Sequence, residues 1–228
     1  MIIAIDGPAG AGKSTVAKIL AKELDFLYID TGAMYRALTL KVIEQNLDIQ
    51  DTPRLIEMAR NTNIDLMNNK DGSLKIFLDS RDVAGLIRQP RITKLVSDIA
   101  KIKQVREVML KIQRKLGKQA DSVLDGRDIG TIVFPGADKK FYIDAKFEER
   151  VRRRYQELRE LDQDITLKDV ECDLINRDTI DSSREFAPLK KADNAIYVDT
   201  TDMGIDEVVE ILLKYIRAPG HPNTRAPE

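Results

Sequence analysis

Residues 7–14 read GPAGAGKS, which satisfies the pattern G-x-x-x-x-G-K-[ST] directly after the apolar run 1–5. Glycines permit backbone angles that turn successive N–H groups toward one anion, and the helix that follows adds the partial positive charge of its N-terminus. In such a loop, Lys13 can reach the β- and γ-phosphates of a nucleotide and Ser14 can hold Mg²⁺. The pattern therefore predicts a polyphosphate cradle made of Gly7, Pro8, Ala9, Gly10, Ala11, Gly12, Lys13, Ser14 and Thr15.

Composition limits the other classes of function. The chain has 228 residues, a formal net charge of −1, one cysteine and one histidine. A charge near zero gives no case for a nucleic acid polymer or an anionic membrane as partner. A single cysteine excludes an internal disulfide, and the single histidine excludes a histidine-based metal site. We expect Cys172 to be a small apolar side chain of a helix, and the protein to be cytoplasmic because the first apolar run is too short for a signal peptide or membrane anchor.

Strand and helix patterns alternate along most of the chain. Short apolar runs predict strands, and apolar residues three and four apart predict helices between them. This alternation favours an α/β fold with a parallel sheet flanked by helices, whose ligands gather at the carboxyl ends of the strands. The expected strands are 2–5, 26–29, 122–124, 140–143 and 195–198, and the expected helices are 13–24, 32–45, 52–60, 147–161, 166–178 and 205–216.

Three segments differ from that alternation. Residues 64–83 alternate apolar and polar side chains around Asp71-Gly72, which predicts a small antiparallel hairpin. Residues 90–116 carry one long helical pattern, in which a break or bend is expected. Residues 218–228 are proline-rich without an apolar pattern, and we expect a disordered tail there.

Arginines form a second pattern. Arg36 and Arg127 each follow a predicted strand end on the edge that carries the cradle, and planar guanidinium groups suit phosphate oxygens. Residues 177, 181 and 184 (Arg, Asp, Arg) share one face if they are helical. For the arginines of 150–154 a solvated or paired role is the more ordinary interpretation, as for the i, i+4 pair of Glu149 with Arg153. Periodicity alone favours reading Ser97 as a tolerated helix serine.

Several stretches together resemble the bacterial cytidylate kinases, a branch of the nucleoside monophosphate kinases. The resemblance covers about residues 1–217 in order, and DGRDIGTIVFP combined with REFAPL is far more specific than the glycine loop alone. The matching stretches are GPAGAGKST at 7–15, DTGAMYRAL at 30–38, QVREVMLKIQR at 104–114, DGRDIGTIVFPGAD at 125–138 and INRDTIDSSREFAPL at 175–189.

The resemblance implies a transferase that moves the γ-phosphoryl group of Mg²⁺-ATP to CMP or dCMP, in pyrimidine nucleotide metabolism. It implies one kinase domain over 1–217, with a core (1–30, 121–147, 188–217), a CMP-binding region (31–120, β insert about 62–86) and a lid (about 148–187). The residues that would face CMP are Thr31, Tyr35, Arg36, Ser97, Arg106, Arg127, Asp128, Arg177, Asp181 and Arg184. The catalytic group would be Lys13, Arg127, Arg150, Arg154 and Arg177, with Arg153 a further lid arginine.

Two other functions stay open on the residues alone. The first is a kinase for a different small acceptor. The second is a nucleotide-dependent switch or ATPase that uses the β insert to bind a partner, although no clear hydrophobic strand ending in DxxG supports it beyond Asp125. We expect a monomer that acts on small molecules, and ATP consumption without an acceptor would separate a kinase from an ATPase.

Overall fold

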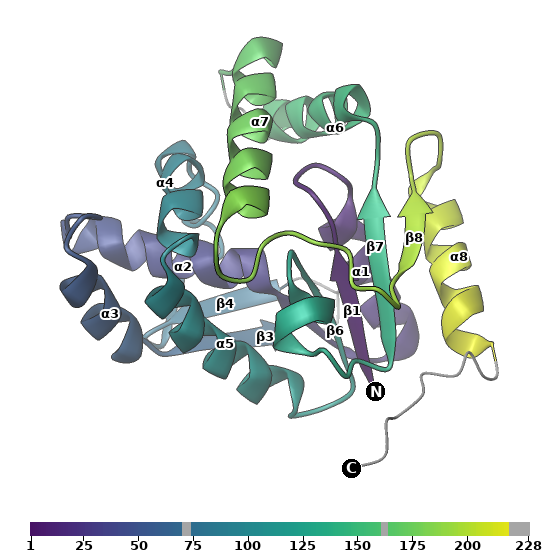
Figure 1. The fold of residues 1–228 in the computed structure, drawn as a ribbon, viewed down its shortest axis with the longest axis horizontal. Coiled ribbons are helices and arrows are strands. Elements are labelled where there is room, and N and C mark those ends of the chain that lie inside the picture. The colour runs from purple at the N-terminus through teal and green to yellow at the C-terminus, as the bar shows by residue number, and fades with distance from the viewer. Residues whose placement is uncertain (70–73, 161–163, 219–228) are drawn as a thin grey trace.

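The computed structural model describes residues 1–69, 74–160 and 164–218 and builds a five-stranded sheet at its centre (Figure 1). The strands are β1 (Ile2–Asp6), β2 (Leu27–Asp30), β6 (Ser122–Gly126), β7 (Lys139–Asp144) and β8 (Ile196–Asp199), in the order β2-β6-β1-β7-β8. Every neighbouring pair is parallel. The predicted α/β fold is confirmed, and all five carboxyl ends lie on one edge.

Helices cover both faces of this sheet. On one face, α1 (Lys13–Leu24) and α8 (Ile205–Arg217) pack on Ile3, Ile5 and Phe141. On the other face, Ala4 and Leu124 contribute to a core with α2 (Thr31–Glu44) and α5 (Lys103–Gly117). Because β1 is apolar toward both layers, it reads in sequence as a continuous apolar run rather than an alternating one.

The segment between α2 and β6 forms a separate layer beside the sheet. It contains α3 (Thr52–Arg60), an antiparallel sheet of β3 (Ile64–Asn68), β4 (Leu74–Leu78) and β5 (Arg81–Asp82), and α4 (Pro90–Ala100). The predicted hairpin is confirmed as strands, its turn at Asp71-Gly72 lies outside the described residues, and the two-residue β5 has no clear sequence signal. The long helical pattern breaks as expected, at 101–102, where Ile102 adopts an extended conformation and becomes the N-cap of α5.

Two helices, α6 (Phe147–Glu160) and α7 (Leu167–Ser183), lie over the carboxyl edge of the sheet (Figure 1). The sequence predicted that the second would end near Asp178, and it continues for five more residues. Thr179 and Ser182 satisfy their hydroxyls by donating to carbonyls one turn back, which lets poor helix formers remain helical. A π-helical turn, η1 (Ile129–Val133), follows β6 and was not foreseen.

Three further predictions concern the C-terminal tail, Cys172 and a possible membrane span. The proline-rich tail falls almost wholly on 219–228, which lie outside the described residues. Cys172 is exposed on α7, so its expected role as an apolar side chain of a packed helix is wrong. None of the helices in the described part of the chain has the length and apolar character that crossing a bilayer requires.

The packing of α8 predicts a stability effect. Leu212 is fully buried under the sheet. Leu212→Ala should lower the free energy of unfolding by about 2–5 kcal/mol, through lost apolar burial and a residual cavity. Urea unfolding measures it, and Leu167→Ala, at a side chain that is 53% exposed, is the matched control. Equal losses in the two variants would contradict this account of the core.

Candidate active site

The glycine loop adopts conformations that only glycine takes readily. Gly7 has φ of 148°, and a Cβ there would lie 1.9 Å from the carbonyl oxygen of Ile143 on β7. Gly12 has φ of 83° and forms the N-cap of α1, whose first N–H groups therefore open toward the loop. A helix N-terminus with uncapped N–H groups and a glycine loop around it is an anion site.

Lys13 lies inside this loop, where its ammonium group is hydrogen-bonded to a backbone carbonyl. Its Nζ donates to the carbonyl of Pro8 at 2.5 Å. The pKa of Lys13 is lowered to about 7, mainly by burial and then by the positive charge of Arg127, while Asp125 and Asp6 oppose the shift. A negatively charged ligand in the loop would favour the protonated lysine, so the cradle is electrostatically suited to phosphate.

A buried carboxylate accompanies the hydroxyl of Ser14. Asp125, at the carboxyl end of β6, accepts a hydrogen bond from Ser14 Oγ at 2.7 Å and one from the Tyr28 hydroxyl at 3.0 Å. Burial raises the pKa of Asp125 to about 7, and Asp30 adds to the rise. These hard oxygen atoms beside a phosphate cradle fit Mg²⁺, which takes one or two protein ligands and completes its shell with phosphates and water. The described residues contain no cluster of three or more acidic, histidine or cysteine side chains, so the fit depends on this pair.

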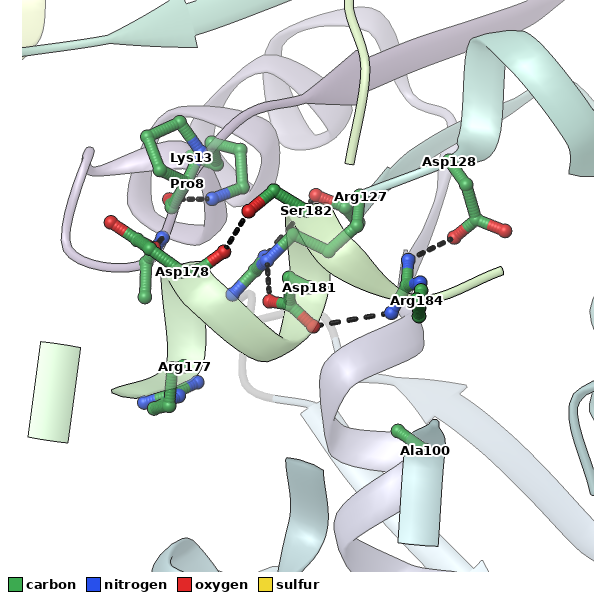
Figure 2. A network of polar contacts seen from close by, with 12 residues as sticks. Pro8, Lys13, Ala100, Arg127, Asp128, Arg177, Asp178, Asp181, Ser182 and Arg184 are labelled. Atoms are coloured by element: carbon green, nitrogen blue, oxygen red, sulfur yellow. Dashed lines mark hydrogen bonds and ion pairs between the residues drawn. The ribbon is translucent and has the colours of Figure 1, made fainter. Parts of the chain in front are cut away.

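A chain of alternating charges lies beside the cradle, as Figure 2 shows for its last four members. Arg106 donates to Asp128 at 2.6 Å, and Arg184 lies 3.6 Å from the other oxygen of Asp128. Arg184 also donates to Asp181 at 3.1 Å, and Arg127 donates to the second oxygen of Asp181 at 2.8 Å. Five residues thus form one connected network, from α5 (Arg106), the segment after β6 (Arg127 and Asp128) and the C-terminal end of α7 (Asp181 and its C-cap Arg184).

Further arginines leave this region with excess positive charge. The pKa of Arg36 is lowered to about 9, mainly by burial and then by the charges of Arg177 and Arg154. Burial likewise lowers the pKa of Arg177, with Arg127 and Arg154 adding to the shift. The buried Nε atoms of Arg154 and Arg177 have no hydrogen-bond acceptor. Buried donors without acceptors are costly, and phosphate oxygens would satisfy them.

The lid arginines divide between two environments. Arg150 is buried and donates to the carbonyl of Ala9 at 3.0 Å and to Asp178 at 2.6 Å, which joins α6, α7 and the glycine loop. Arg153 pairs with Glu149 at 2.7 Å, as its i, i+4 spacing predicted, and also donates to Thr200. Arg154 belongs to the arginine group described above, although it also contacts Glu157.

The other predicted residues line the same region. The Tyr35 ring lies under the Arg106 guanidinium, with 5.3 Å from its centroid to the guanidinium carbon. Ser97 is buried on α4, and Thr31 donates its hydroxyl to the Asp125 carbonyl at 2.6 Å. Arg36 donates to Thr93 at 2.8 Å.

Sequence reasoning gave no role to three buried or half-buried groups here. Asp6 ends β1 and accepts N–H bonds from the turn η1. Asp178 accepts from the Ala9 N–H at 3.3 Å and from Arg150. Tyr28 holds Asp125. The sequence did contain a signal for Asp6, because a carboxylate that ends a buried strand directly before a glycine loop needs hydrogen-bond partners. The contacts of Asp178 and Tyr28 had no local signal, because they join segments far apart in the sequence.

The glycine loop, the ordered arginines and the parallel sheet define a nucleotide-binding protein of the phosphoryl-transfer class. The family model described as "Cytidylate kinase" matches residues 3–218. Cytidylate kinase from Clostridioides difficile is 49% identical over 95% of this chain and 98% of its own length. That from Caldanaerobacter subterraneus is 50% identical, over 94% of each chain. The chain belongs to the cytidylate kinase family.

A solved structure supports the fold alone. An uncharacterized protein from Eubacterium ventriosum aligns over 96% of this chain and 99% of its own, with a TM-score of 0.53 and 14% identity. At that identity the likeness concerns the arrangement of strands and helices and carries nothing about the substrate.

The site's charge predicts a ligand effect that needs no catalysis. Tripolyphosphate without metal should raise the melting temperature, because it supplies the missing acceptors; at 100 times its dissociation constant the gain is about 2.7 kcal/mol. Sodium chloride at equal ionic strength is the control. Lys13→Ala should lose most of the shift, and an undiminished shift in that variant would remove the cradle as the binding site.

Proposed function

We propose that this protein transfers the γ-phosphoryl group of ATP to CMP or dCMP, giving ADP and CDP or dCDP. The carrying observation is the buried positive group beside the glycine loop, in which Arg154 and Arg177 keep donors without acceptors. Phosphoryl transfer needs donor and acceptor phosphates held in line by cations, with little covalent chemistry from the protein. Family membership supports cytidine monophosphate as the acceptor.

On the donor side, the backbone of 7–15 would bind the ATP phosphates and Lys13 would contact the β- and γ-phosphates. Ser14 and Asp125 would hold Mg²⁺, which supplies charge neutralisation across the donor phosphates when it is bound. Lys13 could then exchange the Pro8 carbonyl for phosphate oxygens. Arg150 would act by positioning the glycine loop, since its guanidinium donates to the Ala9 carbonyl and to Asp178.

On the acceptor side, Arg36 and Arg127 would hold the phosphate of CMP. Asp128 would accept from the exocyclic amine of cytosine, and Arg106, Ser97 and Arg184 would serve its acceptor atoms, with Thr31 and Tyr35 around the ring. Arg177 and Asp181 would serve the sugar or the transferring phosphates. The network Arg106–Asp128–Arg184 supports this assignment, because it holds one carboxylate between two guanidinium groups, hydrogen-bonded to Arg106 at 2.6 Å and 3.6 Å from Arg184.

The same arrangement would discriminate against uracil. Uracil places a carbonyl where cytosine has its amine, so the Asp128 carboxylate would face an acceptor. A buried mismatch of that kind costs about 1–3 kcal/mol. A lid made of about residues 148–187 would exclude water and limit ATP hydrolysis, and a general base is not required.

We further propose that the single domain 1–217 works as a monomer on small molecules, with the core, CMP-binding region and lid boundaries given above. The nucleotide substrates and the family resemblance favour the cytoplasm. A different acceptor, or an ATPase that binds a partner, is the competing outcome of the experiment that follows.

The test is a panel of acceptors with Mg²⁺-ATP, namely CMP, dCMP, UMP, AMP, GMP and a reaction without acceptor. We expect CMP and dCMP to exceed UMP by about tenfold or more in kcat/KM, which corresponds to about 1.4 kcal/mol. The reaction without acceptor should be nearly silent. Equal rates for all acceptors would refute the base assignment, and steady ATP loss without acceptor would refute the kinase.

Arg36 allows a sharper test of the acceptor phosphate site. Arg36→Ala removes a half-buried guanidinium. The KM for CMP should therefore rise at least tenfold, since a charged hydrogen bond is worth about 1.5–3 kcal/mol. The KM for ATP should stay within a factor of about two, because the donor contacts lie on the loop. Arg54→Ala, at a guanidinium whose side chain is 72% exposed, is the control. An unchanged KM for CMP would assign Arg36 to a structural role.

A further inference from the structure

Asp6 makes a contact that joins the two halves of the site. It is the last residue of β1, it directly precedes Gly7, and it is 3% exposed. Its Oδ1 accepts the N–H of Ile129 at 2.8 Å, and its Oδ2 accepts the N–H of Gly130 at 2.7 Å. These are the first two residues of η1, the turn that follows Asp128. One carboxylate therefore fixes the start of the donor loop against the segment that carries Asp128.

The turn η1 needs such an acceptor because the first N–H groups of a helical turn have no partner within the turn. An aspartate at the N-cap normally supplies one with its own side chain. Asp128 occupies the N-cap of η1 but makes no side-chain cap bond. Its two oxygens lie toward Arg106, at 2.6 Å, and Arg184, at 3.6 Å.

The geometry points to Asp6 as a positioning residue for base recognition: it caps η1 in place of Asp128, so that the Asp128 carboxylate stays turned toward Arg106 and Arg184. This rests on the proposed function, in which Asp128 reads the cytosine amine. Without Asp6, the Asp128 carboxylate would be free to cap the N–H groups of its own turn, as an N-cap aspartate normally does. A carboxylate drawn onto that turn would leave the base site and face the amine less well.

The surroundings of Asp6 suit this role. Burial raises the pKa of Asp6 to about 6, and the N–H groups of Gly130 and Ile129 oppose the shift; Asp128 adds to it and Lys13 opposes it. Lys140 passes close to the same turn but directs its Nζ to Pro135 and Asn194. At pH 8 the carboxylate is ionised and both of its oxygens can accept, so the test is made there.

The test compares Asp6→Asn with a matched control at the other end of the same strand. Asp138, which precedes β7, accepts the backbone N–H of Ile2 at 2.7 Å, so Asp138→Asn also disturbs a carboxylate contact with the backbone of β1, at the end of the strand away from the site. In Asp6→Asn, the side-chain NH₂ group would replace one of the two acceptor oxygens, so it would face a backbone N–H and one hydrogen bond would be lost. We expect the ratio of kcat/KM for CMP over UMP to fall by about tenfold, the size of an unsatisfied buried group.

Asp138→Asn should leave that ratio within a factor of about two, whatever it does to stability. Loss of folding alone lowers the amount of active enzyme and affects CMP and UMP equally, so the ratio separates positioning from stability. An unchanged ratio in Asp6→Asn, with turnover lowered for both acceptors, would overturn the inference.

A double-mutant cycle tests whether Asp6 acts through Asp128. Asp128→Asn should itself narrow the ratio, and Asp6→Asn should then narrow it little further, since its effect is already lost. If Asp128→Asn leaves the ratio unchanged, the proposed base reading fails. If Asp128→Asn narrows it but Asp6→Asn does not, the base reading stands and the inference about Asp6 fails.

Gly130→Ala gives a milder second variant should Asp6→Asn fold poorly. A Cβ at Gly130 would lie 3.3 Å from Asp6 Oδ2 and 3.2 Å from Lys140 Cδ, so the Asp6 carboxylate and the Lys140 side chain must give way by a few tenths of an ångström. We expect a narrowing of the ratio in the same direction, about twofold to fivefold. A ratio equal to wild type in this folded variant would also count against the inference.

Discussion

The parallel pairing of β1 with β6 places Asp6 opposite Gly126, and the site depends on that register. The glycine loop begins at the residue after Asp6, and Arg127 and Asp128 follow Gly126 directly. A slip by one residue would turn each side chain of the strand to the opposite face of the sheet. The pairing therefore brings a phosphate cradle and a charge-reading segment together without any loop having to reach across the molecule.

Buried charge is the second constraint, and the molecule meets it by alternation. From Arg106 to Arg127, each cation of the network lies next to a carboxylate, which offsets the desolvation of both. Arg127 and Arg184 hold the pKa of Asp181 below its usual value against the effect of burial. Burial lowers the pKa values of Arg36 and Arg177, and also that of Arg184 within the network. Arg177 lies 3.6 Å from Asp173, and Arg36 donates to the neutral hydroxyl of Thr93. Both guanidinium groups lie where phosphate groups would bind.

Much of the fold could be predicted from the sequence, because it depends on local patterns. Apolar runs marked the five strands, and helical spacing marked α1, α2 and α8. Strand ends placed Arg36 and Arg127 on the edge of the glycine loop. The helical spacing of Arg177, Asp181 and Arg184 nearly held: Arg184 is extended, as the C-cap of α7, yet it still contacts Asp181.

What the sequence could not supply depends on contacts across long separations. Asp6 meets the turn η1 more than a hundred residues away, and no local pattern announces a π-helical turn. The sequence also could not tell the roles of the lid arginines apart. Arg150, Arg153 and Arg154 share one helix, and they differ only in the residues that contact them. The C-terminal end of α7 and the short β5 were also missed, whereas the capping box of Thr166 marked where α7 begins.

The spacing of three charged residues at the C-terminal end of α7 matches the positions of three parts of the site. Asp178 contacts the glycine loop, Asp181 contacts Arg127 three residues later, and Arg184 closes the interval beside Asp128. A helix rises about 1.5 Å and turns about 100° per residue, so one inserted or deleted residue would aim these contacts away from their partners. The contacts of α7 with the site therefore constrain the number of residues between Asp178 and Arg184 more tightly than they constrain the side chains on the outer face of the helix.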